Sequence, residues 1–197
     1  MFKGRYLGMV SQWMENGNLH EYIRKNPRVD RYRLCIQVAS GLAYMHDVKM
    51  VHGDLKAINV LVSSEGVAKL SDFDFSLMLE ASLAFSESSN HGLGALEFFS
   101  ESPSGRTKSS DVYALGMTML EIFTGAVPYP QLQRDFQVIV KVQQGVLPIR
   151  PKDRFKDDGR GNQMWELLAS CWNRDPDARP SVAEVVESLN FISSRNT

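Results

Sequence analysis

The stretch His52-Gly53-Asp54-Leu55-Lys56-Ala57-Ile58-Asn59 places a carboxylate, an amine and a carboxamide within eight residues. A pattern typical of a β-hairpin follows it, and Asp72-Phe73 comes directly after that hairpin. Taken singly, Asp, Asn and Lys are common in exposed turns and indicate nothing. The ordered set, H-x-D-x-K-x-x-N followed by a hairpin and Asp-Phe, is specific and predicts a reactive site.

These side chains suit the transfer of a phosphoryl group. Asp54 offers a carboxylate that can accept or orient a hydroxyl proton. Lys56 can neutralise the charge of a transferring phosphoryl group. Asn59 and Asp72 offer oxygen ligands of the kind that Mg²⁺ prefers, and the hairpin between them can bring the two together. We therefore expect Asp54, Lys56 and Asn59 to be catalytic, and Asn59 and Asp72 to hold metal.

Outward from this stretch, hydrophobic periodicity predicts a mostly helical α+β domain with a small β-hairpin. Residues 80–90 show no period and are expected to form a mobile loop. A capping box is expected at Ser181 and Glu184, where the last helix begins. Helices are expected over residues 19–25, 30–47, 111–125, 132–144, 162–172 and 181–193, and strands over 7–14, 50–51, 59–62 and 67–70.

The composition of the chain argues against several classes of function. The chain has 197 residues, which suits a single domain, and its 22 Lys and Arg against 23 Asp and Glu give no sign of a nucleic-acid interface. The longest apolar run, 112–120, is too short to span a membrane. Cys35 and Cys171 fall in apolar helical patterns and are expected to be buried free thiols. No signal peptide is visible, so a cytoplasmic location is expected.

Taken together, these motifs resemble the eukaryotic protein kinase family over nearly the whole chain, from the family's hinge onward. The resemblance implies one kinase domain over residues 1–197 with the fold of the kinase C-terminal lobe. Within it the hinge falls at 10–18, the catalytic loop at 50–62, the activation segment at 72–97 and a helical subdomain at 98–197.

The same resemblance assigns cofactors and their contacts. It implies ATP and Mg²⁺ as cofactors and a protein as substrate or partner. Gln12 and Met14 would contact adenine through the hinge backbone, and Leu61 would form an apolar floor under the base. Lys56 favours Ser or Thr over Tyr as the acceptor.

Further residues match structural positions of the family. Asp72-Phe73-Asp74 matches Asp-Phe-Gly, and Ala95-Leu96-Glu97 matches Ala-Pro-Glu. By resemblance, Asp111 anchors the backbone of the catalytic loop, His52 and Phe73 are structural, and Arg179 pairs with Glu97. The segment 171–180 is typical of tyrosine kinases and tyrosine-kinase-like kinases.

The sequence also departs from the family. It contains no G-x-G-x-x-G and no V-A-I-K, so we expect a truncated kinase domain without the N-terminal lobe that covers the phosphates. Gly53 stands where many kinases have an arginine that binds a phosphorylated activation loop. Asp74 replaces the glycine of Asp-Phe-Gly, and Leu96 replaces the proline of Ala-Pro-Glu.

Three functions remain open. The first is a protein kinase, active in its complete form and weak or inactive as this chain alone. The second is a non-catalytic pseudokinase fragment that serves as a binding scaffold. The third is a small-molecule kinase of the aminoglycoside or choline type, which Lys56, the helix at Asp111 and the segment 171–180 disfavour.

Overall fold

The computed structural model describes residues 10–72, 77–78, 106–132 and 134–195. Its strands are β1 (Met50–Val51), β2 (Val60–Val62), β3 (Ala68–Leu70) and β4 (Leu77–Met78), and single 3-10 turns cover Ala57–Asn59 and Pro176–Ala178. Its helices are α1 (Leu19–Lys25), α2 (Arg31–Asp47), α3 (Lys108–Thr124), α4 (Asp135–Gln143), α5 (Gly159–Cys171) and α6 (Val182–Ser194). The prediction of a mostly helical α+β fold is confirmed.

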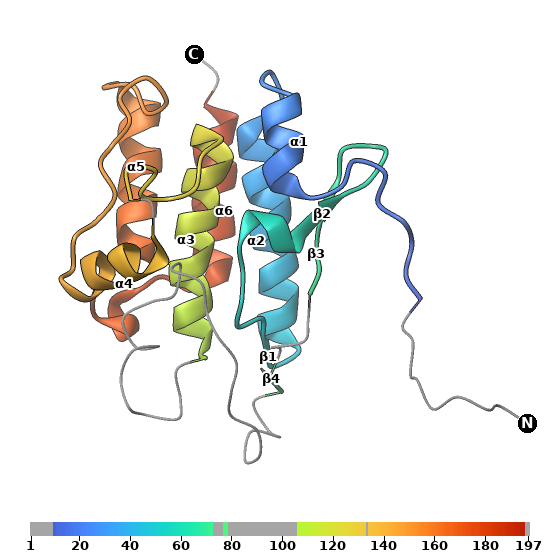
Figure 1. Cartoon of the computed structure of the whole chain (residues 1–197), viewed down its shortest axis with the longest axis horizontal. Helices are drawn as coiled ribbons and strands as arrows, with labels where there is room; N and C mark the ends of the chain where they lie inside the picture. The colour runs from blue at the N-terminus through green and yellow to red at the C-terminus, as the bar shows by residue number, and fades with distance from the viewer. Residues whose placement is uncertain (1–9, 73–76, 79–105, 133, 196–197) are drawn as a thin grey trace, which may run out of the picture.

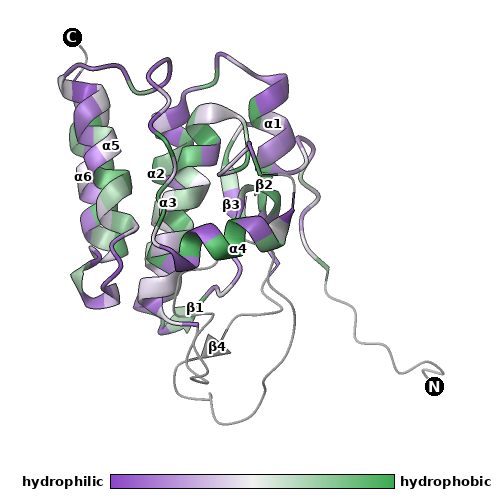
Figure 2. Cartoon of the chain, turned by 60° about the vertical axis from the view of Figure 1, so that its left-hand side comes forward, coloured by the Kyte–Doolittle hydropathy of each residue, from purple (hydrophilic) through white to green (hydrophobic). Residues whose placement is uncertain are grey.

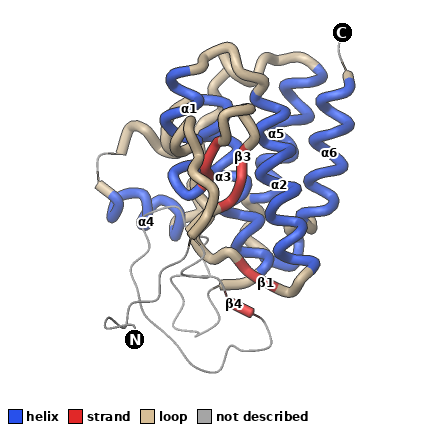
Figure 3. Tube along the Cα trace, turned by 90° about the vertical axis from the view of Figure 1, so that its right-hand side faces the viewer, coloured by secondary structure: helices blue, strands red, loops and turns tan. Residues whose placement is uncertain are grey.

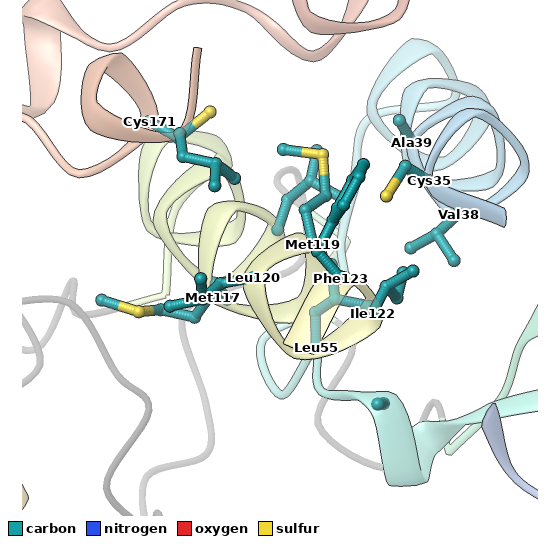
Figure 4. Packing of buried hydrophobic residues seen from close by; sticks show 14 of the residues in the cluster. Cys35, Val38, Ala39, Leu55, Met117, Met119, Leu120, Ile122, Phe123 and Cys171 are labelled. Atoms are coloured by element: carbon teal, nitrogen blue, oxygen red, sulfur yellow. The ribbon is translucent and has the colours of Figure 1, made fainter. Parts of the chain in front are cut away.

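Helix α3 forms the centre of the molecule. It contacts α1, α2 and α5, and Figure 1 shows it between α2 and α5. Every residue from Ser110 to Phe123 is buried, because few polar side chains interrupt the helix and neighbours cover it on most sides. In Figure 4, Cys35 and Val38 of α2 approach α3 from one side and Cys171 of α5 from another.

Helices α2 and α6 each bury one apolar stripe. In α2 the predicted stripe is confirmed, since Leu34, Val38, Leu42 and Met45 are all buried. Figure 2 shows hydrophobic and hydrophilic residues alternating along α6, which packs against α2 and α5. Both cysteines are buried and free, as predicted, and burial raises the pKa of the Cys171 thiol to about 12.

Short strands complete the fold. β2 and β3 pair antiparallel with Leu61 opposite Lys69, which confirms the hairpin. β1 pairs with β4, placing Val51 opposite Leu77. Figure 3 shows this second pair at one end of the helical body, away from α1. The sequence did not predict β4, whose two residues form a strand only through their pairing with β1.

The segment 7–14 is not a strand where the structure describes it, since residues 10–14 are irregular. A strand forms only when a neighbour takes up its backbone hydrogen bonds. Within the described residues, the backbone near this segment bonds to β2 only from Asn16 onward. There the N–H of Asn16 donates to the Val62 carbonyl (3.1 Å), and the N–H of Val62 donates to the Gly17 carbonyl (2.9 Å).

Helix ends differ from the prediction by a few residues. α3 begins at Lys108 instead of Asp111, because Thr107 caps it and Ser110 completes a capping box. Gly125 ends the helix in the left-handed conformation (φ 73°). α4 is shorter than the predicted 132–144, whereas α5 begins three residues before the predicted 162–172 and ends one residue earlier. The predicted capping box of Ser181 and Glu184 is confirmed.

Close packing at Gly116 of α3 yields a stability test. A Cβ there would lie 2.6 Å from Nε1 of Trp172 and 2.8 Å from Cβ of Cys171. We expect Gly116→Ala to lower the free energy of unfolding by about 1–3 kcal/mol, because the core must shift to admit a methyl group. Urea denaturation measures the loss.

Gly159→Ala is the matched control, since a Cβ at this helical glycine meets nothing within 4 Å. It should leave the denaturation midpoint unchanged or raise it slightly. Equal midpoints for Gly116→Ala and Gly159→Ala would contradict the packing of α5 directly on α3.

Candidate active site

Three predicted side chains meet in the loop after β1. Nζ of Lys56 lies 2.8 Å from Oδ2 of Asp54. Nδ2 of Asn59 donates to the same Oδ2 (3.0 Å) and to the backbone carbonyl of Asp54 (2.9 Å). The 3-10 turn Ala57–Asn59 folds the chain back and so brings Asn59 to Asp54. One carboxylate oxygen is thus oriented by two donors.

The three groups differ in exposure. Asn59 is buried, whereas the side chains of Asp54 and Lys56 keep 17% and 21% of their surface exposed. Solvent therefore reaches the side chains of Asp54 and Lys56, while Asn59 is held inside the fold. Because Asp54 engages the nitrogen of the Asn59 amide, the amide oxygen is the atom that Asn59 can offer a metal.

Asp111 anchors the loop that carries these groups. Its side chain is 1% exposed, and it accepts hydrogen bonds from the backbone N–H groups of His52 (2.8 Å) and Gly53 (2.9 Å). Nε2 of His46, in the last turn of α2, donates to the same carboxylate (2.9 Å). The anchoring role expected for Asp111 therefore has a direct geometric basis.

Gly53 has φ 80°, in the left-handed region where glycine is unstrained. This conformation turns two successive N–H groups toward one carboxylate. A residue with a side chain would be strained in this conformation, whereas glycine adopts it without strain. The same glycine leaves the loop without the arginine side chain that many kinases carry at this position.

His52 links the catalytic loop to the end of the hairpin. It is buried, its Nε2 donates to the carbonyl of Ser71 (3.2 Å), and its Nδ1 accepts from the N–H of Asp54 (3.3 Å). These partners select the neutral tautomer protonated at Nε2. Burial lowers the pKa of His52, against a weaker opposing effect of Asp111.

Ser71 places Asp72 beside the catalytic loop. The N–H and the Oγ of Ser71 both donate to the backbone carbonyl of Asn59, each at 2.9 Å. Asp72 follows with φ 62°, a left-handed conformation that Asp tolerates better than most residues, and it is exposed. The two predicted metal ligands, Asn59 and Asp72, therefore belong to directly bonded segments.

The predicted adenine contacts lie along the segment before α1. Gln12 is exposed, and Met14 and Leu61 are half-buried. Leu61 forms a β-bridge with Asn18, so the end of this segment lies against β2. A nucleotide role for Gln12, Met14 and Leu61 stays a prediction.

Some predicted residues fall outside the described part of the chain, namely Phe73, Asp74, Leu96 and Glu97. Of the predicted pair Arg179 and Glu97, the structure thus describes Arg179 alone, and the pairing stays a prediction. Arg179 is buried, and it donates to the backbone carbonyls of Asn173 (2.9 Å) and Ser109 (2.9 Å). The expected mobile loop, 80–90, also lies outside the described residues.

Sequence reasoning missed two residues of this network, His46 and Ser71. His46 follows the apolar stripe of α2 four residues after Leu42, and a polar residue on a buried stripe signals a buried partner. Ser71 carried no comparable signal, because serine is common at strand ends.

Among the described residues, no cluster of three or more His, Cys, Asp or Glu side chains could hold a metal ion. Asn59 and Asp72 nevertheless fit Mg²⁺, which is commonly bound by one or two protein oxygens together with substrate phosphates. Within the same described residues, no helix is long and apolar enough to cross a membrane.

A carboxylate held by a lysine two residues on and an asparagine five residues on, with a second carboxylate after a hairpin, is the catalytic-loop arrangement of protein kinases. Comparison with known proteins agrees. A family model described as protein tyrosine and serine/threonine kinase matches residues 1–189. The chain belongs to this family.

The curated relatives include both serine/threonine-protein kinases and a tyrosine-protein kinase. The chain is 28% identical to the serine/threonine-protein kinase STY17 of Arabidopsis thaliana over 94% of this chain and 32% of the relative. It is 33% identical to a probable serine/threonine-protein kinase of Dictyostelium discoideum over 95% and 37%. It is 28% identical to the tyrosine-protein kinase Btk of Drosophila melanogaster over 99% and 25%. The chain thus spans about a third or less of these relatives.

The Asp111 anchor can be tested by Asp111→Asn. The amide keeps one acceptor oxygen but turns an NH₂ group toward backbone donors, leaving a buried N–H without a partner. We expect a loss of about 2–4 kcal/mol in the free energy of unfolding, measured by urea denaturation. Asp153→Asn, on a side chain that is 75% exposed, should be neutral. A neutral Asp111→Asn would argue against the anchor.

The free energy of unfolding should depend on pH, because His52 is buried in its neutral form. Its pKa is lowered from 6.5 in the folded protein, so below that value the unfolded chain binds a proton that the folded chain does not. The free energy of unfolding should therefore fall between about pH 7.5 and about pH 5.5. His52→Asn should flatten this slope in denaturation curves taken across the range. An unchanged slope would show that His52 does not titrate differently on folding.

Proposed function

We propose that this chain carries the phosphotransfer loop of a protein kinase that moves the γ-phosphoryl group of ATP to Ser or Thr hydroxyls of a protein, with Tyr as a further acceptor. One observation carries the proposal: Oδ2 of Asp54 is oriented by both Lys56 and Asn59. This geometry leaves a fixed, reachable carboxylate beside a cation, which is what the acceptor side of the reaction requires.

Each residue has a role in this proposal. The Asp54 carboxylate accepts a hydrogen bond from the acceptor hydroxyl and orients its oxygen for attack. The Lys56 ammonium lies beside it and offsets negative charge on the transferring group. The buried Asn59 holds Asp54 in place through its nitrogen and faces metal through its oxygen.

The family uses ATP and Mg²⁺. When bound, they supply the phosphoryl group and the charge neutralisation that its transfer requires. In this chain, the oxygens of Asn59 and Asp72 would hold the metal, and the segment with Gln12 and Met14, together with Leu61, would hold adenine. The bonds from Ser71 to Asn59 keep the two metal-facing residues in one unit.

A second candidate is a binding scaffold without catalysis. Val10 is fully exposed and Trp13 is 81% exposed on the segment before α1. Large apolar groups gathered on a surface are typical of protein contacts. In this reading, the hinge side binds a protein partner and Asp54 has no chemical role.

A radiolabel assay with Mg-ATP and a generic protein substrate separates the two candidates. The proposed kinase should lose at least about 100-fold of its incorporation rate in Asp54→Asn, because the amide cannot accept and orient the hydroxyl proton in the same way. Asp72→Asn should raise the Mg²⁺ concentration needed for half-maximal incorporation.

Asp153→Asn is the control, since it makes the same chemical change on an exposed side chain and should leave the rate unchanged. Incorporation that persists in Asp54→Asn would refute the assigned role. Absence of incorporation by the unmodified chain, together with no Mg-dependent thermal shift by ATP, would favour the scaffold.

A further inference from the structure

A groove lies between α5 and α6, the two helices at one edge of the helical body in Figure 2. The helices contact each other, and the groove has a volume of about 490 Å³. Its lining residues recur three and four positions apart, from Gln163 to Ser170 in α5 and from Glu187 to Ile192 in α6. Each helix therefore presents one continuous face to the groove.

The groove combines apolar side chains with carboxylates. Leu167 and Ile192 are 8% and 3% exposed and form its inner surface, while the ring of Phe191 is 54% exposed. Glu166 and Glu187 are exposed at its sides, and neither has an ion pair or hydrogen bond among the residues that the structure describes. Two unpaired negative charges thus border an apolar surface.

Gln163 adds an independent sign that the groove holds a ligand with hydrogen-bond donors. Its Oε1 is buried and accepts no hydrogen bond within the described part of the chain. A buried acceptor that lacks a partner is costly. Because Gln163 lines the groove, a donor on a bound molecule can supply the missing bond.

One basic group lies near the same groove. The guanidinium carbon of Arg195, the residue that ends α6, is 4.6 Å from the centroid of the Phe191 ring. The face of this ring therefore already accepts a cation. Since Arg195 would repel a second cation at this end, positive groups of a ligand belong beside Glu166 and Glu187.

These features together select one kind of occupant. The apolar surface calls for apolar side chains, and the carboxylates with the unpaired acceptor call for positively charged donors. A fatty acid or an anionic headgroup would bring negative charge toward Glu166 and Glu187, which is unfavourable. An amphipathic helix with Lys or Arg beside its apolar stripe satisfies all of these requirements, and such helices bind in grooves of this kind.

We propose that the groove between α5 and α6 binds a basic amphipathic helix of a partner protein. The apolar stripe of that helix packs on Leu167, Phe191 and Ile192, and its Lys and Arg side chains pair with Glu166 and Glu187. The inference goes beyond the proposed function, because α5 and α6 carry none of the residues assigned to phosphotransfer.

Fluorescence anisotropy tests the proposal with a labelled peptide made of two repeats of Leu-Lys-Lys-Leu-Leu-Lys-Leu. We expect saturable binding to the chain with a Kd of about 1–100 μM, which weakens as salt is added because the charges are exposed. The same peptide with glutamate in place of every lysine should not bind. Equal binding of the two peptides, or a Kd above about 1 mM for the lysine peptide, would overturn the proposal.

The charge contribution is tested by the double variant Glu166→Gln and Glu187→Gln. It should raise the Kd about fivefold, since each exposed ion pair contributes modestly. The matched control, Glu65→Gln with Asp153→Asn, removes two negative charges from exposed side chains outside α5 and α6 and should leave the Kd unchanged. An equal rise in both proteins would show that the peptide responds to net charge and would refute the groove.

The apolar contribution is tested by Phe191→Ala. We expect the Kd to rise about tenfold, because the ring is expected to be covered on binding. Phe136→Ala is the matched control, since Phe136 of α4 is 70% exposed and lies outside the groove, and it should have no effect. Equal effects of the two substitutions would contradict the proposed contact.

Two further measurements complete the test. The substituted side chains are exposed, so urea denaturation midpoints should stay unchanged, and a loss of binding then reports lost contacts. Laurate should not displace the peptide, and displacement by laurate would overturn the proposal in favour of an acyl chain as occupant. Because binding is measured without ATP, the result stands whether or not the chain transfers phosphate.

Discussion

The hydrogen bonds from the backbone of His52 and Gly53 to the carboxylate of Asp111 are the constraint on which the rest of the site depends. They lie in the interior, where an unmet donor or acceptor is costly, so the loop cannot leave α3 without a large penalty. His46 of α2 donates a third hydrogen bond to the same carboxylate. A single buried carboxylate thereby joins two helices and the beginning of the loop that carries Asp54, Lys56 and Asn59.

The order of the bonds explains how a short loop becomes rigid. His52 bonds to Ser71, Ser71 bonds to Asn59, and Asn59 bonds to Asp54. Each link connects the loop to the end of the hairpin or back to itself. In the proposed phosphotransfer, this rigidity would lower the entropic cost of bringing an acceptor hydroxyl to one carboxylate oxygen, because the orientation exists before anything binds.

Much of this arrangement could be predicted from the sequence. Local signals were dependable: the stripe of α2, the hairpin and the capping box at Ser181 all have causes within a few residues. The start of α3 was misplaced because Thr107 and Ser110 resemble ordinary loop residues. The strand predicted at 7–14 and the missed β4 depend on partners distant in sequence, as does the contact between His20 and Glu121. No local pattern encodes a bond between residues 101 positions apart.

The burial of α3 on most sides also bears on how the chain folds. A helix without a polar face has no favourable isolated state in water, so it gains its stability only when α2, α5 and the loop close around it. Assembly should then be cooperative, with few stable partial forms. Shortened versions that drop either flank would expose the apolar centre and tend to aggregate, so the whole helical body around α3 folds as one unit.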